Sequence, residues 1–499
     1  MKNAILRLSA LLLAVCLIAG IPLASAVDGF SYAYTYTYDY WGDLRESPDA
    51  YRVKDFLTAS DLGLDKELSN PSSLFVDGSD LYIVDTGNNR IIQLTTDGKQ
   101  WSVVRYIDSF TGDTAPLTFN GPQDVYVDAD GMLYITDTNN NRIVKLDKDL
   151  NYQLSFLKPV DPTFDQTLSY LPTKLVADVS GRVFAMAQNV NKGLMKYEAD
   201  GTFTGFIGAS PVKYSAYELI WRMLSTKEQR AQQASFVPTE YNNIAIDDRG
   251  FFYVVTKTFD ENELGGGGAE PVRRLNSLGN NILIENGNYW VIGDVQWAPG
   301  DQNLSRPGPS KFADITVFDN DIYVALDETH NRLFGYDKQG NLLWAFGGVG
   351  NALGFFNKPV AVEHMGYDLI VLDSLAAAIT IMTPTAYGQQ IFNATEQYDR
   401  GEYTQSADTW TEVLKQNANY DLAYIGIGRA KLQAGEYEDA CRYFKMARDK
   451  KNYSEAFRYY RSELVEENIG WIFALVAAVM IIPVAVGRIK RIKWEVDNA

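Results

Sequence analysis

A nearly identical heptapeptide occurs twice in this chain and restricts its possible folds more than any other feature. DTGNNRI occupies residues 85–91, and DTNNNRI occupies residues 137–143. Each copy lies in a longer matching frame, which begins at Pro71 or Pro122 and holds a turn and two alternating apolar runs. In repeat architectures each unit buries a face against its neighbours, so the repeat determines the overall fold.

Four weaker copies of the frame follow along the chain. They begin at or near Pro172, Tyr241, Phe312 and Lys358. Each copy holds three or four short alternating runs, which indicate β-strands. Turns rich in Asp and Gly separate the runs, because these residues adopt turn conformations at low cost. Four such turns are expected at residues 128–131, 178–181, 247–250 and 337–340.

Repeated units of about four strands in ~40–50 residues are typical of β-propeller blades. Six copies therefore predict a mainly β fold, a six-bladed propeller over residues 51–385. The sixth copy lacks an outer strand. We expect residues 51–57 (YRVKDFL) to supply it, which would close the ring and remove an open sheet edge.

The frames at Pro71 and Pro122, with their Asp-Thr-x-Asn-Asn-Arg-Ile cores, resemble NHL repeats. The resemblance covers residues 51–383 and is closest in the first two copies. It implies a propeller but no particular activity, because one fold hosts enzymes, binding modules and scaffolds.

Two Asp and Arg pairs flank the heptapeptide turns, namely Asp85 with Arg90 and Asp137 with Arg142. A carboxylate and a guanidinium so placed can pair and bond loop backbone. We interpret these residues as blade-stabilising, and a ligand-binding role for the peptide is the alternative.

A different period begins after the propeller. RGEY at residues 400–403 recurs as AGEY at residues 434–437. The second unit resembles a tetratricopeptide (TPR) repeat in its small and aromatic positions, which are Gly428, Ala430, Gly435, Tyr437, Ala440, Phe444 and Ala447. We predict a TPR-like helical stack over residues 386–468. Such stacks present a concave face to a protein partner.

Both ends of the chain carry apolar segments. Residues 1–26 have the charged start, apolar centre and small-residue end of a signal peptide. Residues 469–487 contain no charge and are long enough to span a bilayer. The basic cluster that follows belongs on the cytoplasmic side. These segments predict a single-pass type I cell-membrane protein with an extracytoplasmic body and a cytoplasmic tail at 488–499.

Charge and cysteine content restrict the partners and the compartment. The chain has 45 basic and 63 acidic residues, a net charge of −18, which disfavours nucleic acid. Cys16 lies in the signal segment, which leaves Cys441 without an intrachain disulfide partner. A disulfide-free exterior protein suits a bacterial surface better than an animal ectodomain.

The first strand of each blade should line a central channel. At equivalent positions these strands carry Ser73, Asp124, Lys174, Asn243, Asp314 and Ala361. Asp124, Asn243 and Asp314 are oxygen donors that suit Ca²⁺. Six-bladed lactonases use a divalent ion in such a place, so the pattern is similar to theirs. A solvated polar channel is the alternative, and Lys174 argues against a cation.

Catalytic motifs are otherwise scarce. The chain has two histidines, His330 and His364, which excludes a zinc site of three histidines. We interpret His330 as a turn residue and His364 as a core residue. No phosphate-binding loop, nucleophile elbow or dinucleotide fingerprint is present.

Two further segments invite interpretation. Tyrosines alternate with other residues within residues 27–50, so an extended strand would place them on one face. That strand could pack on the propeller or offer an aromatic platform for carbohydrate. Residues 215–233 have the pattern of an amphipathic helix, which is a plain insertion, a lid over the channel or a docking site for a partner.

The sequence thus favours a non-enzymatic binding or scaffold protein at the bacterial surface, with protein partners and an association with a membrane transporter as a further hypothesis. The alternative is a divalent-metal-dependent lactonase or hydrolase with its site in the channel.

Overall fold

The computed structural model describes residues 35–39, 41–42, 44–112, 116–208, 241–256, 270–284, 293–294 and 309–498. The predicted signal peptide and the predicted helix at 215–233 lie outside these residues. The chain divides into two compact units. The first comprises Met1–Thr37 and Glu46–Gly388, and the second comprises Tyr38–Arg45 and Gln389–Ala499.

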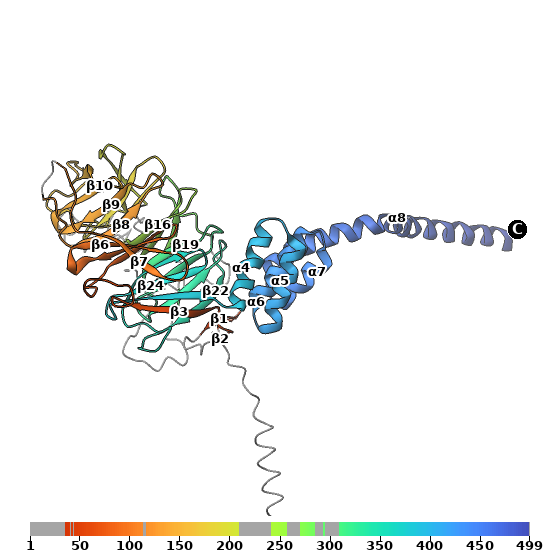
Figure 1. Cartoon of the computed structure of the whole chain (residues 1–499). Helices are drawn as coiled ribbons and strands as arrows, with labels where there is room; N and C mark the ends of the chain where they lie inside the picture. The colour runs from red at the N-terminus through yellow and green to blue at the C-terminus, as the bar shows by residue number, and fades with distance from the viewer. Residues whose placement is uncertain are drawn as a thin grey trace, which may run out of the picture. The chain divides into compact units, whose positions relative to one another are not determined.

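The first unit is a six-bladed propeller, as predicted, and its sheets are antiparallel (Figure 1). The inner strands of the blades are β4 (Ser73–Asp77), β8 (Pro122–Val127), β12 (Pro172–Ala177), β16 (Tyr241–Ile246), β19 (Phe312–Val317) and β23 (Pro359–Met365). The second strands are β5 (Asp80–Asp85), β9 (Leu133–Asp137), β13 (Val183–Ala187), β17 (Phe252–Thr256), β20 (Tyr323–Asp327) and β24 (Asp368–Asp373).

The third and outer strands complete the blades. The third strands are β6 (Arg90–Thr96), β10 (Arg142–Leu146), β14 (Leu194–Tyr197), β18 (Val272–Leu275), β21 (Arg332–Tyr336) and β25 (Ala378–Pro384). The described outer strands are β7 (Trp101–Ile107), β11 (Tyr152–Phe156), β15 (Phe203–Ile207), β22 (Leu342–Gly347) and β3 (Tyr51–Thr58).

The ring is closed by a strand from the N-terminal side of the first blade. β3 pairs with β25 from Ala378↔Thr58 to Pro384↔Tyr51, so it forms the outer strand of the sixth blade. The sequence prediction for this segment is confirmed. Each inner strand also contacts the inner strands of both adjacent blades, including β23 with β4.

The core lies between the blades rather than within one layer. Second strands such as β13 (VFAMA) and β17 (FYVVT) are buried along their whole length. They read as nearly continuous apolar runs because adjacent blades cover both of their faces. Between the sixth and first blades, for example, Ile370 and Leu372 pack in one cluster with Ile83.

Aspartate turns connect the inner and second strands, as predicted. The Oδ1 atom of Asp128 accepts hydrogen bonds from the backbone N–H groups of Asp130 and Met132, both at 3.0 Å. Gly131 has a φ of +77°, a conformation that glycine adopts without strain. The turns that end at Gly181 and Gly250 repeat this geometry, and so does the turn that ends at Gly340 between β21 and β22.

Of the tyrosine-rich segment, the structure describes residues 35–39, 41–42 and 44–50, which contain two short strands. Tyr36 lies in β1 (Tyr36–Tyr38), which pairs with β22 at Tyr36↔Ala345 and extends the fifth blade. β2 (Leu44–Glu46) comes next in the chain. The Tyr36 side chain is fully buried, and its hydroxyl donates to Asp294 at 2.8 Å. Of the two interpretations of this segment, packing on the propeller therefore holds for Tyr36, because its buried ring cannot contact a carbohydrate.

The second unit contains antiparallel helical hairpins. Its helices are α4 (Ala386–Asp399), α5 (Tyr403–Gln416), α6 (Asp421–Gln433), α7 (Tyr437–Met446) and α8 (Lys450–Asp497). Gly426 lies against Trp410 and Gly428 lies against Phe444, where an added Cβ would come within 2.4 Å and 2.7 Å of the rings. Small residues on α6 thus admit aromatic rings from both neighbouring helices, while the TPR assignment stays a prediction.

The last helix, α8, runs through the predicted half-repeat, the apolar run and the basic tail without a break. It includes Pro483. This helix is long and apolar enough to span a membrane, and none of its most apolar stretch is buried within the protein.

Candidate functional site

Two cavities lie at opposite ends of the inner strands. The Gln123 cavity, of about 620 Å³, is lined by the first residues of these strands and by loops of the second and third strands. The Glu363 cavity, of about 570 Å³, is lined by later residues of the same strands and by the turns after them. Lys174 lines both cavities.

Asp124, a predicted channel residue, binds its own neighbours. The Ser73 hydroxyl donates to Oδ1 at 2.6 Å, and the Leu175 N–H of the next blade donates to Oδ2 at 2.9 Å. The Lys174 Nζ atom lies 3.5 Å from Oδ1 and donates to Ser73 at 2.9 Å. The carboxylate therefore joins the second and third blades and holds the lysine in the channel.

Asp314 and Asn243 form a second cluster. The Asn243 amide donates to Asp314 Oδ1, which also accepts from the Ile315 N–H at 2.8 Å. Oδ2 accepts from the Val362 N–H of the next blade at 2.8 Å. Burial raises the pKa of Asp314 to about 6, although attraction by Lys174 opposes this shift.

The side-chain oxygens of Asp124, Asn243 and Asp314 do not form the predicted Ca²⁺ site. The oxygens of Asp124 and Asp314 point at backbone N–H groups, and a lysine ammonium lies beside Asp124. Ca²⁺ needs six to eight oxygen ligands directed at one point. Within the described ranges, no group of three or more His, Cys, Asp and Glu side chains is arranged to hold a metal ion.

A carboxyl–hydroxyl–imidazole group, not predicted from the sequence, borders the Glu363 cavity. The Thr316 hydroxyl donates to Glu363 Oε2 at 2.9 Å and lies 2.8 Å from His364 Nδ1. His364 is half-buried, with its ring against Phe318 at 4.6 Å, rather than a core residue. Adjacent Glu and His residues in a strand normally point to opposite faces, so the sequence carries no signal for this arrangement.

Burial shifts both titratable groups toward their neutral forms. It raises the pKa of Glu363 to about 8, with a further rise from the negative charge of Asp314. Burial lowers the pKa of His364 to about 4. At neutral pH the carboxyl therefore holds its proton and the imidazole is uncharged.

The pH dependence of stability gives a test of this cluster. Because the pKa of Glu363 is raised in the folded protein, folding binds a proton, and its contribution to stability is lost as pH rises from about 4.5 to about 8. Glu363→Gln should therefore gain stability relative to the parent protein between pH 5 and pH 9, by on the order of 4 kcal/mol, because each unit of pKa difference corresponds to about 1.4 kcal/mol. Thermal unfolding across this range measures the difference. Glu67→Gln, at an exposed position, is the control, and equal pH profiles for the parent and Glu363→Gln would contradict the assignment.

The structure brings together both predicted blade-stabilising pairs. Arg90 Nε donates to Asp85 at 2.8 Å, and Arg142 Nε donates to Asp137 at 2.8 Å. The second oxygen of each carboxylate accepts a backbone N–H from the loop before the inner strand, from Ser69 to Asp85 and from Asn120 to Asp137.

Asparagines complete these turns. Asn89 and Asn141 have φ values of +55° and +57°, in the left-handed region that asparagine tolerates well. The repeated peptide is thus explained by local geometry.

The fifth blade carries a variant of the same turn. Asp327 Oδ2 lies 2.9 Å from His330 Nδ1, so His330 takes the turn position that the sequence predicted. Burial opposes protonation, but the hydrogen bond and the attraction of Asp327 raise the pKa of His330. Arg332 bonds Asp294 instead.

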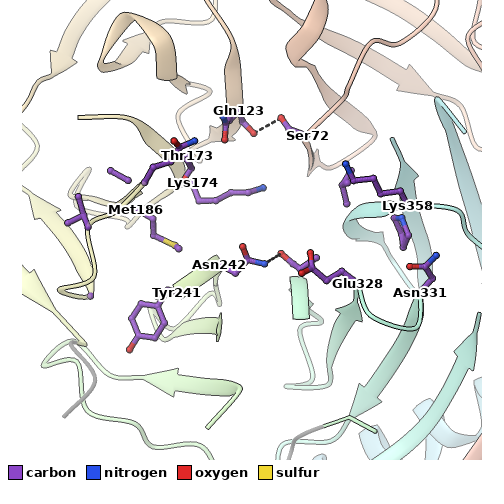
Figure 2. A pocket seen from close by; sticks show the side chains of 17 residues that line it. Ser72, Gln123, Thr173, Lys174, Met186, Tyr241, Asn242, Glu328, Asn331 and Lys358 are labelled. Carbon is purple, nitrogen blue, oxygen red and sulfur yellow. Dashed lines mark hydrogen bonds between the residues drawn. The ribbon is translucent and has the colours of Figure 1, made fainter. Parts of the chain in front are cut away.

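The Gln123 cavity presents polar side chains from several blades (Figure 2). Ser72 donates its hydroxyl to the Gln123 backbone oxygen at 2.8 Å, and the Asn242 amide donates to the Phe312 oxygen at 2.9 Å. Figure 2 shows Lys174 and Lys358 extending into the open space between the blades. Such a concave site with convergent polar groups is typical of ligand binding.

Comparison with known proteins identifies one repeat. Residues 119–146 match the NHL repeat model. Human NHL repeat-containing protein 3 is 37% identical over 87 residues, which cover 17% of this chain and 24% of that protein. The mouse protein of the same name is 31% identical over 124 residues, covering 21% and 34%. The chain therefore spans about a quarter to a third of these curated relatives.

Solved structures are similar at low identity. Virginiamycin B lyase from Staphylococcus aureus with quinupristin has a TM-score of 0.39 at 12% identity, covering 66% of this chain and 87% of that one. A streptogramin B lyase has a TM-score of 0.39 at 11% identity, covering 68% and 100%. These likenesses carry no information on activity. The chain thus carries an NHL repeat within a six-bladed propeller and is similar, over part of its length, to NHL repeat-containing proteins.

Proposed function

We propose that this protein is a membrane-anchored binding and scaffold protein at the bacterial cell surface. The propeller recognises a ligand or protein, and the TPR-like hairpins hold a protein partner, for which a membrane transporter is one candidate. The body stands outside the cytoplasm as a type I protein.

The observation that carries this proposal is a difference in hydrogen bonding between polar side chains of the channel. Some are bonded within the propeller, whereas others, in the Gln123 cavity, bond to no described residue. Asp124 and Asp314 are committed to backbone N–H groups of neighbouring blades, as structural residues are. The Gln123 cavity instead has side chains that bond to no described residue, among them Gln123 and Thr173. Half-buried polar groups of this kind favour a ligand or water as their partner.

The anchor is supported by the exposure of α8. Apolar side chains along residues 469–487 lie on the surface, and Trp471 and Phe473 are 79% and 69% exposed. Soluble proteins do not leave such a surface in water, whereas a bilayer would cover it. The basic residues at 488–493 favour a cytoplasmic end, and Trp471 and Trp494 would lie near the two interfaces.

A pull-down from native membranes tests the proposal. The full chain should capture a protein partner, and a variant lacking residues 389–446 should lose it, because the hairpins would form the contact surface. Surface substitution Lys99→Met on the propeller is the control and should retain the partner. Equal recovery with and without the hairpins would contradict the scaffold role.

A hydrolase is the second candidate, favoured by the Glu363–Thr316–His364 cluster. A carboxyl group that stays protonated near neutral pH can act as a general acid. If the protein turned over a substrate in the Glu363 cavity, Glu363→Gln would abolish turnover. Partner capture by the hairpins would persist in the same variant.

A further inference from the structure

The end of α8 that follows the apolar run carries an excess of positive charge. Residues 488–497 (RIKRIKWEVD) contain four basic and two acidic side chains, which give a net charge of +2. Arg491 is paired with Glu495 at 3.3 Å. The other basic residues form no ion pair within the part of the chain that the structure describes, namely Arg488, Lys490 and Lys493. Even with Asp497 set against one of these cations, two positive charges remain without an internal partner.

The position of these cations along α8 corresponds to the depth of lipid headgroups. The proposed anchor places residues 469–487 across the bilayer, and α8 continues without a break to Asp497. Because a helix rises ~1.5 Å per residue, residues 488–493 occupy roughly the first 9 Å beyond the apolar run. The polar layer on each side of the hydrocarbon core is about 5–8 Å thick. The charged ends of these long side chains therefore reach the layer that contains lipid phosphates.

The same stretch of α8 has an apolar stripe on one face. Ile489, Ile492 and Val496 are spaced by three and four residues, so they lie on one side of the helix. All three side chains are exposed. At about 100° per residue, Arg488 and Lys493 lie on the two flanks of this stripe. At the boundary between acyl chains and headgroups, such a stripe contacts lipid while the flanking cations contact anionic headgroups.

We propose that residues 488–496 form a binding site for anionic phospholipids of the membrane that α8 spans. Arg488, Lys490 and Lys493 contact lipid headgroups, and the apolar stripe contacts the acyl chains beside them. Zwitterionic lipids also carry a phosphate, but only an anionic lipid has the net charge that unpaired cations at this depth attract. The inference rests on the proposed membrane anchor and adds a lipid preference to it.

Native mass spectrometry of the full-length protein tests the inference. The protein is released from detergent micelles that contain equal amounts of phosphatidylglycerol, which is anionic, and phosphatidylcholine, which is zwitterionic. We expect phosphatidylglycerol adducts to exceed phosphatidylcholine adducts by about fivefold or more, because each basic side chain near a membrane surface adds to the attraction of an anionic lipid.

A triple substitution locates the site. Arg488→Gln, Lys490→Gln and Lys493→Gln together should bring the ratio of the two adducts to about one, because they remove the unpaired cations and keep polar side chains. The matched control changes the net charge by the same amount at three exposed lysines of the propeller, by glutamine substitution of Lys99, Lys148 and Lys192. This control should keep the preference of the parent protein.

The outcomes separate the lipid preference from the anchor. Equal retention of the two lipids, retention of neither, or an unchanged preference in the triple variant would overturn the inference. Loss of the preference in the propeller control would overturn it as well, because the effect would then follow net charge alone. Extraction of the full-length chain from phosphatidylcholine vesicles by alkaline wash would instead contradict the anchor. A chain that stays embedded but binds both lipids equally contradicts only the lipid site.

Discussion

Replacing β3 with a flexible segment should abolish the native propeller. If a Gly/Ser sequence replaces Tyr51–Thr58, the sixth blade loses its outer strand, and the backbone edge of β25 is exposed. Unpaired strand edges promote aggregation. Leu57 also packs with the cluster that includes Ile379 and Ile381 between the sixth and first blades. We expect an insoluble chain, or one whose Tm falls by more than about 10 °C.

The size of the change in Tm distinguishes the loss of ring closure from the effect of altering a surface loop. The same Gly/Ser replacement at residues 97–100, an exposed turn of the first blade, should shift Tm by only a few degrees. A synthetic peptide of residues 49–58, added in trans during refolding, should restore part of the soluble fraction. A soluble β3 variant that melts with the parent protein would show that closure does not stabilise the fold.

Asp137→Ala should be among the most destabilising single substitutions in the propeller. Asp137 is fully buried and bonds Arg142, Asn140 and the Asn120 N–H. Its removal leaves the Arg142 charge buried without a carboxylate, which typically costs about 3–5 kcal/mol. Chemical denaturation of the parent protein and the variant measures the difference in the free energy of unfolding.

Three comparisons make this measurement specific. Asp85→Ala should cost less, because Arg90 also pairs with Asp65. Asp137→Ala combined with Arg142→Ala should recover part of the loss, since no unpaired charge remains. Asp130→Ala, at an exposed turn position, should stay within about 0.5 kcal/mol of the parent protein. A cost for Asp137→Ala as small as that of Asp130→Ala would contradict the stabilising role.

Asp294 illustrates an interaction that repeat spacing could not reveal. It binds Tyr36 from the N-terminal strand and Arg332 from the fifth blade. In the first two blades the equivalent arginines pair with the aspartate five residues earlier. The fifth blade keeps an aspartate at that place, Asp327, but the side chain bonds His330 instead. In the fifth blade the buried arginine is thus paired with an aspartate outside the turn, which also binds a segment far away in sequence.

The architecture followed from the sequence because its signals are local. Alternating runs, aspartate turns and the repeated heptapeptide act over a few residues, and they predicted the strands, the six blades and the closing strand β3. The long apolar run in α8 is equally local, because length and composition alone make it a candidate membrane span.

The chemistry of the channel was decided only by the tertiary structure. Equivalent positions placed Asp124, Asn243 and Asp314 near one another, but the direction of each carboxylate depends on which backbone N–H the next blade presents. For the same reason the sequence did not predict the Glu363–Thr316–His364 cluster, because its members come from adjacent blades. Periodicity specifies which residues share a face, whereas hydrogen-bond direction, burial and pKa depend on neighbours that only the closed ring brings together.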